Sequence, residues 1–403
     1  MNRIKALSLA VLLCLSTLLG LCSCGSDDTV TLNVYNWGEY ISDGSEESLH
    51  VVKEFEKYYE QTYGQKIKVN YTMYASNEDM YAKLRSGSTS YDVVIPSDYM
   101  IQRMINEDML EPLDFSNIPN ANYIADEFRN LYYDPDNLYS VPYTYGMVGV
   151  IYNENMVDTA DTGSWDLLWN EKYSGKILQF NNARDAFGTA MYYQKIDVNT
   201  TDRTEWEIAL EYLRNQKSIV QGYVMDEIFN KMKGESAAIA PYYAGDYLTM
   251  YDSNDALAFY YPEEGTNVFV DAMCIPKGSK HKEIAEIFIN FMLSEEIAVA
   301  NAEYIGYASP NTLVRENEEY LAYMEDWHPD AMSILYPDLS TLTTSYYHAL
   351  DAQTQNIANE LWEQLKIESS VGSGIHTLAT IIVLATAAWL LWRWIIRRYR
   401  SQY

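Results

Sequence analysis

Short runs of β-forming residues alternate with helical stretches from residue 29 to residue 366, and this alternation constrains the fold more than any other feature. Strands that alternate with helices predict α/β layers with largely parallel sheets. The 403 residues are enough for two lobes. The expected strands are 30–36, 66–72, 91–96, 146–152, 176–180, 237–243, 256–261 and 267–276. The expected helices are 47–64, 77–86, 98–108, 165–170, 185–195, 203–215, 225–233, 281–292, 295–303 and 351–366. The segments 110–145 and 305–350, rich in Pro, Asn, Asp and Tyr, are expected to be surface connections.

The N-terminal segment predicts export. Arg3 and Lys5 precede an apolar stretch over 6–21, and Leu21-Cys-Ser-Cys24 follows. This pattern is typical of a secretory signal, and its end resembles a bacterial lipobox. We therefore expect a lipoprotein signal peptide over 1–23, a lipid on Cys24 and a short polar tether over 24–28. An ordinary cleaved signal is the alternative.

The C-terminal segment predicts a membrane-spanning helix over 375–396. Residues 375–392 carry no formal charge, tryptophans follow, and 397–403 is a basic tail. Length, aromatic residues and basic flank together favour one transmembrane helix with a cytoplasmic tail. Both ends therefore predict a protein of the cell membrane, with its binding domain on the extracellular or periplasmic side.

Charge and motifs narrow the class of function. The formal charge of −29 argues against nucleic acid and is compatible with cationic ligands. The sequence has no glycine-rich phosphate loop, no Gly-x-Ser-x-Gly elbow and no His-Glu-x-x-His zinc helix. With Cys24 lipidated, only Cys274 remains in the mature chain, which leaves no disulfide and no cysteine metal cluster. We predict no catalytic residue, metal or cofactor, although a glycosidase with two distant carboxylates stays open.

Polar and aromatic residues gather at the ends of expected strands. The stretches are Asn36-Trp-Gly-Glu-Tyr40, Tyr91-Asp-Val-Val-Ile-Pro-Ser-Asp-Tyr99, Phe180-Asn-Asn-Ala-Arg-Asp-Ala-Phe187 and, within one strand, Phe269-Val-Asp271. In open α/β sheets, ligands bind where the carboxyl ends of strands meet. Rings with a few carboxylates suit an alkylammonium ligand, because rings cover methylenes and attract the cation while carboxylates accept from its N–H groups.

These stretches, in this order and spacing, resemble the substrate-binding proteins of polyamine ABC transporters, the spermidine/putrescine-binding family. The resemblance runs from about Thr29 to about Lys366. Further anchors are Ser76-Asn-Glu-Asp-Met-Tyr-Ala-Lys-Leu84, Tyr139-Ser-Val-Pro-Tyr143, Ala183-Arg184, Ile305-Gly-Tyr307 and Ser309-Pro-Asn311. The resemblance implies a type II periplasmic-binding-protein clamp, with two α/β lobes joined by a hinge that crosses near 143–148 and 262–273. Lobe 1 would comprise 29–145 and about 272–313. Lobe 2 would comprise 146–271 and about 314–368.

The resemblance also implies roles for individual positions. Asp185 and Asp271 would be the charge partners of two amines, and Asn182 would hold a terminal amine. The rest of the expected site is Trp37, Gly38, Tyr40, Ser97, Tyr99, Tyr243, Phe269, Tyr307 and His348. Simpler interpretations are lobe packing for Trp37, a surface or hinge acid for Asp271, and a helix cap for Ser97.

Departures from the family pattern affect the ligand. Gly38 stands where a hydroxyl residue is common, Asn182 replaces an acid, and Tyr243 and Phe269 replace tryptophans. Fewer anionic contacts favour putrescine over spermidine, although a mixed preference stays open. The resemblance implies delivery to an ABC permease with an intracellular ATPase. Alternatives are a clamp for another small solute, such as iron or a sugar, a surface glycosidase, and a sensory ectodomain.

Overall fold

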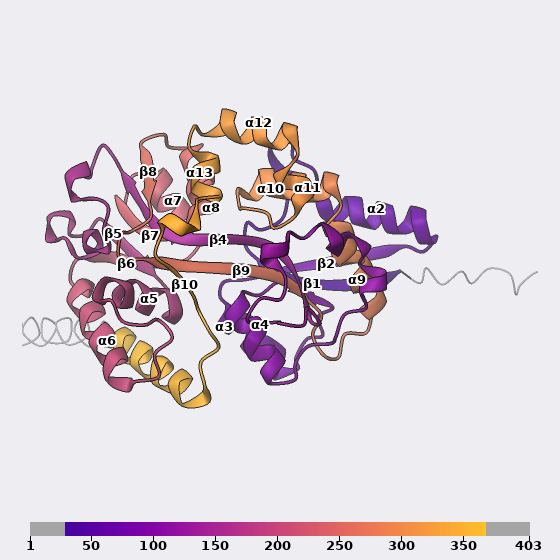
Figure 1. Ribbon diagram of the computed structural model, residues 1–403, viewed down its shortest axis with the longest axis horizontal. Coiled ribbons are helices and arrows are strands. Elements are labelled where there is room, and N and C mark those ends of the chain that lie inside the picture. The colour runs from indigo at the N-terminus through magenta and orange to yellow at the C-terminus, as the bar shows by residue number, and fades with distance from the viewer. Residues whose placement is uncertain (1–28, 368–403) are drawn as a thin grey trace, which may run out of the picture.

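Two long strands run through the centre of the molecule and join two α/β lobes that lie side by side (Figure 1). The computed structural model describes residues 29–367. The two strands are β4 (Ser140–Asn153) and β9 (Thr266–Cys274), and every residue of both is buried. They pair antiparallel from Ser140 opposite Cys274 to Met147 opposite Val268. The expected crossings, 143–148 and 262–273, overlap these strands.

Lobe 1 is built on the sheet order β2-β1-β3-β9. Strand β1 is parallel to both β2 and β3, whereas β3 meets β9 antiparallel. Its strands are β1 (Val30–Trp37), β2 (Ile67–Tyr74) and β3 (Val93–Val94). Its helices include α2 (Val51–Tyr63), α3 (Asn77–Ser86), α4 (Asp98–Asn106), α9 (Lys282–Met292) and α10 (Glu295–Ile305).

Lobe 2 continues from β4 through the order β4-β7-β5-β6. Strand β5 is parallel to β6 and β7, and β4 pairs antiparallel with β7 and β8. Its strands are β5 (Ile177–Phe180), β6 (Val220–Val224), β7 (Ile239–Tyr243) and β8 (Leu257–Tyr260). Its helices include α5 (Ala183–Gln194), α6 (Arg203–Lys217), α7 (Glu227–Lys233) and α8 (Ala244–Tyr251).

Helix ends follow the local sequence signals. Helix α3 begins after Ser76, whose side chain accepts a hydrogen bond from the amide of Asp79, and ends at Gly87 in the left-handed region. Helix α9 buries an apolar face that includes Phe288, and the ring of Phe288 meets Phe55 of α2 at 4.9 Å between centroids. Capping and amphipathic packing therefore fix the helices around the lobe 1 sheet.

The segment 305–350 was expected to be a surface connection, and that expectation is wrong. It forms α11 (Thr312–Arg315), α12 (Glu318–Trp327), α13 (Ala331–Leu335) and β10 (Thr344–Tyr346). Tyr320 and Met324 of α12 are fully buried, because they lie one helical turn apart on its inner face. Residues 352–367 are helical, and Trp362 meets Phe187 and Tyr223 of lobe 2.

The expected fold class needs a correction at the C-terminus. Between residues 29 and 367, none of the helices is long and apolar enough to cross a membrane. The described residues form the two-lobed clamp, and the transmembrane helix that the sequence predicted is not among their helices. The expected segments 1–23, 24–28, 375–396 and 397–403 lie outside the described residues.

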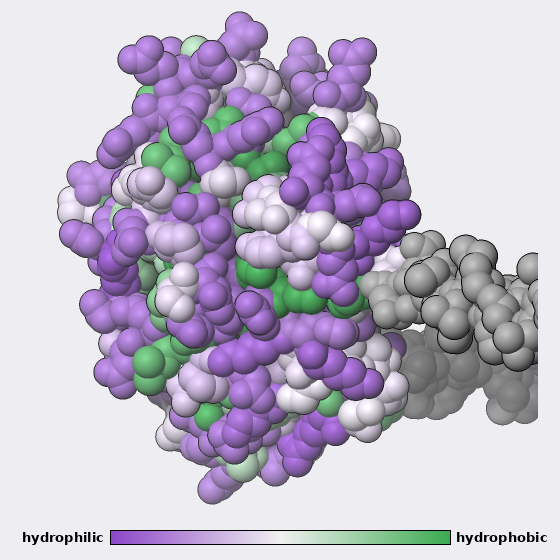
Figure 2. Space-filling view, turned by 90° about the vertical axis from the view of Figure 1, so that its right-hand side faces the viewer, coloured by the Kyte–Doolittle hydropathy of each residue, from purple (hydrophilic) through white to green (hydrophobic). Residues whose placement is uncertain are grey.

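Charged and polar side chains cover most of the molecular face seen in Figure 2, and hydrophobic groups occupy small separate areas between them. The chain has 57 acidic and 28 basic residues, so an acidic surface surrounds the lobes. Such a surface attracts cations toward any opening between the lobes.

Candidate ligand-binding site between the lobes

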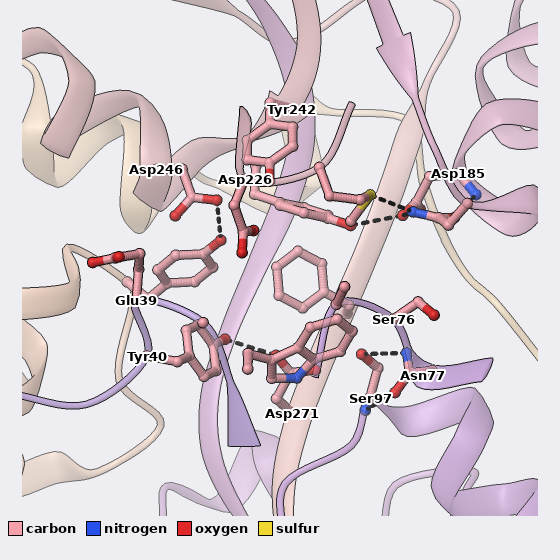
Figure 3. A pocket seen from close by; sticks show the side chains of 18 of the residues that line it. Glu39, Tyr40, Ser76, Asn77, Ser97, Asp185, Asp226, Tyr242, Asp246 and Asp271 are labelled. Carbon is pink, nitrogen blue, oxygen red and sulfur yellow. Dashed lines mark hydrogen bonds between the residues drawn. The ribbon is translucent and has the colours of Figure 1, made fainter. Parts of the chain in front are cut away.

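A pocket lies between the two lobes, where the ends of β1, β3, β5 and β7 approach the middle of β9. It contains about 780 Å³ of space, part of which is open to solvent. Figure 3 shows carboxylates at its two ends, with Asp185 at one and Glu39, Asp226 and Asp246 at the other. The predicted residues that line it are Trp37, Gly38, Tyr40, Ser97, Tyr99, Asn182, Asp185, Tyr243, Phe269, Asp271 and Tyr307.

Asp271 lies in the middle of β9 and is 3% exposed. Its Oδ2 accepts a hydrogen bond from Tyr40 Oη at 2.7 Å, whereas its Oδ1 is buried without a hydrogen-bond partner. Burial raises the pKa of Asp271 to about 6, and the hydroxyls of Ser97 and Tyr40 oppose this shift. The free Oδ1 therefore needs a donor, and an ammonium ligand would supply one.

Asp185 occupies the first turn of α5. The amide oxygen of Asn182 accepts from the backbone N–H of Asp185, and the Asn182 amide nitrogen donates to Asp185 Oδ2, both at 2.8 Å. Tyr243 Oη donates to the same Oδ2 at 2.7 Å. Burial raises the pKa of Asp185. Asn182 thus caps the helix and orients the carboxylate of Asp185.

Ser97 and Tyr99 face the pocket from the start of α4. Asn77 Nδ2 donates to Ser97 Oγ and to Tyr99 Oη, each at 3.1 Å. Tyr99 Oη donates to Glu78 Oε1 at 3.0 Å, and burial raises the pKa of Glu78. The side chain of Ser97 makes no capping hydrogen bond to α4. Ser97 is the N-cap residue of α4 through its backbone carbonyl, which accepts from the N–H groups of Met100 and Ile101, and its hydroxyl is held by Asn77 instead of capping the helix.

Asp246 forms the opposite end of the pocket. Its Oδ2 accepts from Tyr307 Oη at 2.9 Å. Burial raises the pKa of Asp246 to about 8; the Tyr307 hydrogen bond opposes this shift, and the negative charges of Asp226 and Glu39 add to it. Three carboxylates, those of Glu39, Asp226 and Asp246, therefore gather at this end of the pocket.

Aromatic rings form the walls between these carboxylates. Tyr243 meets Phe269 edge-on at 5.4 Å between ring centroids, and Phe269 lies 6.2 Å from Tyr307. Trp37 packs on Tyr74 at 4.6 Å, and its Nε1 is buried without a hydrogen-bond partner. Trp37 thus both packs within lobe 1 and faces the pocket.

Gly38 leaves room for a carboxylate of the other lobe. A Cβ added at Gly38 would lie 2.8 Å from Asp226 Oδ2. The space that a hydroxyl residue would fill at this position is therefore partly occupied by the Asp226 side chain.

His348 does not line the pocket, and Tyr347 does. The His348 ring packs on Tyr132 at 4.3 Å between centroids, and its backbone N–H donates to Asn199 Oδ1 at 2.7 Å. The chain follows β10, and successive side chains of an extended segment point to opposite sides. The pocket residue of this segment is therefore Tyr347, one position before the predicted His348.

Several residues of the pocket were not predicted from the sequence. The carboxylates among them are Glu39, Glu78, Asp226 and Asp246, and the rings are Phe229, Tyr242 and Tyr347. Glu39 and Glu78 lie inside the stretches that carried the resemblance, so a reading of every residue in those stretches would have found them. Asp246 lies in the first turn of α8, directly after the predicted Tyr243 at the end of β7.

The pocket is strongly anionic. Its six carboxylates are Glu39, Glu78, Asp185, Asp226, Asp246 and Asp271, and none of the described residues that line it is lysine or arginine. Arg184 lies nearby, with its guanidinium carbon 4.4 Å from the Tyr347 ring centroid and 5.6 Å from that of Tyr99. It contacts these rings and is not itself part of the lining. Over residues 29–367, no group of three or more His, Cys, Asp or Glu side chains is arranged to hold a metal ion.

Two lobes, two connecting strands and a pocket between them define a clamp-type solute-binding protein. Comparisons with known proteins identify the family. Residues 88–330 match the family described as bacterial extracellular solute-binding protein. The chain therefore belongs to this family.

Individual relatives give the same result. The chain is 31% identical over 351 residues to the spermidine/putrescine-binding periplasmic protein of Escherichia coli K12, a match that covers 86% of this chain and 95% of the relative. A putative spermidine/putrescine ABC transporter protein from Listeria monocytogenes is 34% identical with a TM-score of 0.76, covering 84% of this chain and 100% of the other. The spermidine/putrescine ABC transporter substrate-binding protein of Streptococcus pneumoniae is 35% identical, with a TM-score of 0.66 and coverages of 84% and 99%.

Proposed function

We propose that this protein is an extracellular receptor that binds a polyamine, putrescine or spermidine, between its two lobes and delivers it to an ABC permease driven by an intracellular ATPase. The observation that carries the proposal is the pocket lining, with six carboxylates, many rings and no basic residue among the described residues. A ligand with several ammonium groups on an apolar chain matches both features. The proposed receptor catalyses no reaction.

Each part of the pocket has a role in this proposal. Asp271 accepts from an ammonium through its free Oδ1, and Asp185 and Asp246 accept from ammonium groups at the two ends. Trp37 and Phe269 cover the methylene chain. Release of ordered water from these rings and from the methylenes adds apolar burial to the charge pairing.

Closure follows from the position of the ligand. Trp37 and Ser97 belong to lobe 1, whereas Asp185 and Asp246 belong to lobe 2, so a bound polyamine contacts both lobes only when they are together. Differential affinity for the closed state then shifts the lobes toward closure. The closed shape is what the permease would recognise.

The structure changes the argument about ligand length. The sequence favoured putrescine because Gly38 and Asn182 reduce the number of polar contacts. The pocket contains further carboxylates, namely Glu39, Glu78, Asp226 and Asp246, that this count omitted. The number of anionic groups therefore does not favour the diamine, and the proposal includes both ligands.

We also propose that Cys24 carries the lipid that tethers the receptor to the outer face of the cell membrane. The support is the sequence Leu21-Cys-Ser-Cys24 after an apolar segment. Cys24 lies outside the described residues. Mass spectrometry of the N-terminal peptide would detect the lipid, and an unmodified Cys24 in membrane-isolated protein would contradict this part of the proposal.

Calorimetric titration tests the receptor function. We would titrate the protein with putrescine, spermidine, spermine and glucose, and repeat this for Asp271→Asn and Trp37→Ala. The control variant is Asp255→Asn, which removes an exposed carboxylate that does not line the pocket. We expect one-to-one binding of a polyamine, weakened by both pocket variants and unchanged in the control. A folded protein that binds no polyamine would overturn the proposal.

A further inference from the structure

A second, larger space adjoins the pocket at the Asp246 end. It lies between α7 and α8 of lobe 2 and the 47–49 loop and α10 of lobe 1, with α12 at its edge. We call it the α8–α10 groove, and it contains about 1890 Å³ of space including open solvent. It shares Glu39, Asp226, Phe229 and Asp246 with the pocket. The two spaces therefore adjoin at these four side chains.

The groove combines carboxylates and rings as the pocket does, but its lining also includes a lysine. Its outer carboxylates are Glu47, Asp252 and Glu303, and its outer rings are Tyr304, Tyr323 and Trp327. The rings of Tyr323 and Trp327 contact each other, with 5.7 Å between their centroids. A basic residue in its lining, Lys233, lies 5.5 Å from the centroid of the Phe229 ring.

The position of the groove sets which part of a ligand would enter it. An ammonium between Asp246, Asp226 and Glu39 sits at the junction of the two spaces. A substituent on that nitrogen, or a further aminoalkyl unit beyond it, would leave the pocket past the four shared side chains and enter the groove. Asp185 lies at the other end of the pocket, away from this junction (Figure 3).

We propose that the α8–α10 groove is a subsite for the extended end of a polyamine, so that the protein binds N-substituted diamines and tetraamines as well as shorter ligands. This proposal rests on the proposed function. The ligand class is an alkylpolyamine with one end lengthened or bearing an apolar group. Tyr323 and Trp327 stack on an apolar group, and Asp252 and Glu303 pair with an additional ammonium.

N-benzylputrescine and putrescine separate the groove from the pocket. We expect N-benzylputrescine to bind the unaltered protein within about tenfold of putrescine. Ala300 of α10 lines the groove but not the pocket. Ala300→Trp therefore places a ring in the groove only. We expect it to weaken N-benzylputrescine binding by about tenfold or more while it leaves putrescine within about twofold. Ser253→Trp, at an exposed groove position, provides the same test should Ala300→Trp fail to fold.

Charge variants give an independent measurement. The double variant Asp252→Asn and Glu303→Gln is expected to weaken spermine binding about three- to tenfold and to leave putrescine unchanged, because only the longer ligand reaches these carboxylates. Asp255→Asn is the matched control and is expected to change neither affinity.

The outcomes separate this proposal from the receptor function. Putrescine binding with N-benzylputrescine more than about a hundredfold weaker would overturn the groove subsite and leave the receptor intact. Equal loss of both ligands in the groove-filled variant would also overturn it. Failure of putrescine, spermidine and N-benzylputrescine to bind at all would overturn the receptor function, and the subsite with it.

Discussion

Asp271 and Asp246 are two carboxylates of the same pocket, each with one tyrosine hydroxyl donating to Oδ2, at 2.7 Å from Tyr40 and 2.9 Å from Tyr307. Their surroundings differ. Asp271 stands on a buried strand, and burial, with a small contribution from Asp185, raises its pKa to about 6. Asp246 stands on a helix, and burial, with contributions from Asp226 and Glu39, raises its pKa to about 8. Near neutral pH, Asp271 is therefore mostly ionised, whereas Asp246 keeps much of its proton until a cation arrives.

This comparison predicts different roles in ligand binding for Asp271 and Asp246. A carboxylate that is already ionised near neutral pH can pair with a cation without first losing a proton. The free-energy cost of burying its charge is part of the stability of the folded protein. A carboxylate that must lose its proton adds binding energy only above its own pKa. Asp271 is therefore the expected main determinant of affinity, and Asp246 the expected origin of pH dependence.

The largest expected effect belongs to Asp271→Asn. We expect it to weaken polyamine binding by about 3 kcal/mol, or roughly 150-fold, at pH 7.5, because it removes a buried carboxylate that pairs with an ammonium. Calorimetric titration measures this change, with Asp255→Asn as the control. A loss smaller than about threefold would show that Asp271 is a structural acid of β9 rather than a ligand.

The second prediction concerns the pH dependence of affinity. Asp246 binds an ammonium as a carboxylate, so below its pKa of about 8 the ligand must displace a proton. Affinity of the unaltered protein is expected to rise from pH 6 to pH 9. Asp246→Asn is expected to cost about tenfold at pH 9 and little at pH 6. Titrations at both pH values measure it. An equal loss at pH 6 and pH 9 would contradict the assigned titration.

The same carboxylate affects the stability of the empty protein. Its folded pKa of about 8 lies above the ordinary value of 3.8. The stabilising protonated form is therefore fully present below pH 4 and is lost as the pH rises through 8. Asp246→Asn removes this loss, so we expect the empty variant to be about 1–2 kcal/mol more stable than the unaltered protein at pH 9 and equal near pH 4. Urea unfolding at both pH values measures it. Lower stability at pH 9 would contradict the direction.

The sequence predicted Asp271 as a site residue but did not predict Asp246. Asp271 and Asp185 were predicted because they lie in stretches on or just after expected strands, and the family resemblance then implied that both pair with amines. Asp226 was missed because it follows β6 (Val220–Val224), a strand with partly exposed residues and no clear alternation. Asp246 was missed because it sits inside α8, which begins directly after β7 and was not expected.

The fold was likewise predicted in part, with most central strands found and the segment 305–350 missed. The sequence predicted β1, β5, β7 and β9 to within a few residues. Strands β5, β7 and β9 are buried almost throughout, which favours a largely apolar run, whereas β1 includes partly exposed and exposed residues. The 305–350 segment gave no such signal, because α11 and α13 are short and bury few residues each. Tertiary contacts with α8 and α10, rather than local pattern, hold these helices in place.

The smallest expected effect tests how the two lobes share the Asp246 end. Gly38 of lobe 1 leaves room for Asp226 of lobe 2, since a Cβ at position 38 would lie 2.8 Å from Asp226 Oδ2. We expect Gly38→Ala to displace that carboxylate and weaken binding about two- to fivefold. Asp226→Ala should cost about the same, and the double variant should cost no more than Asp226→Ala alone, because the two changes act on one carboxylate. Gly222→Ala is the matched control, since a Cβ there meets no atom within 4 Å. Additive losses in the double variant would show that the change at Gly38 affects the ligand independently of Asp226. Position 38 of lobe 1 would then influence binding by more than leaving room for the Asp226 carboxylate.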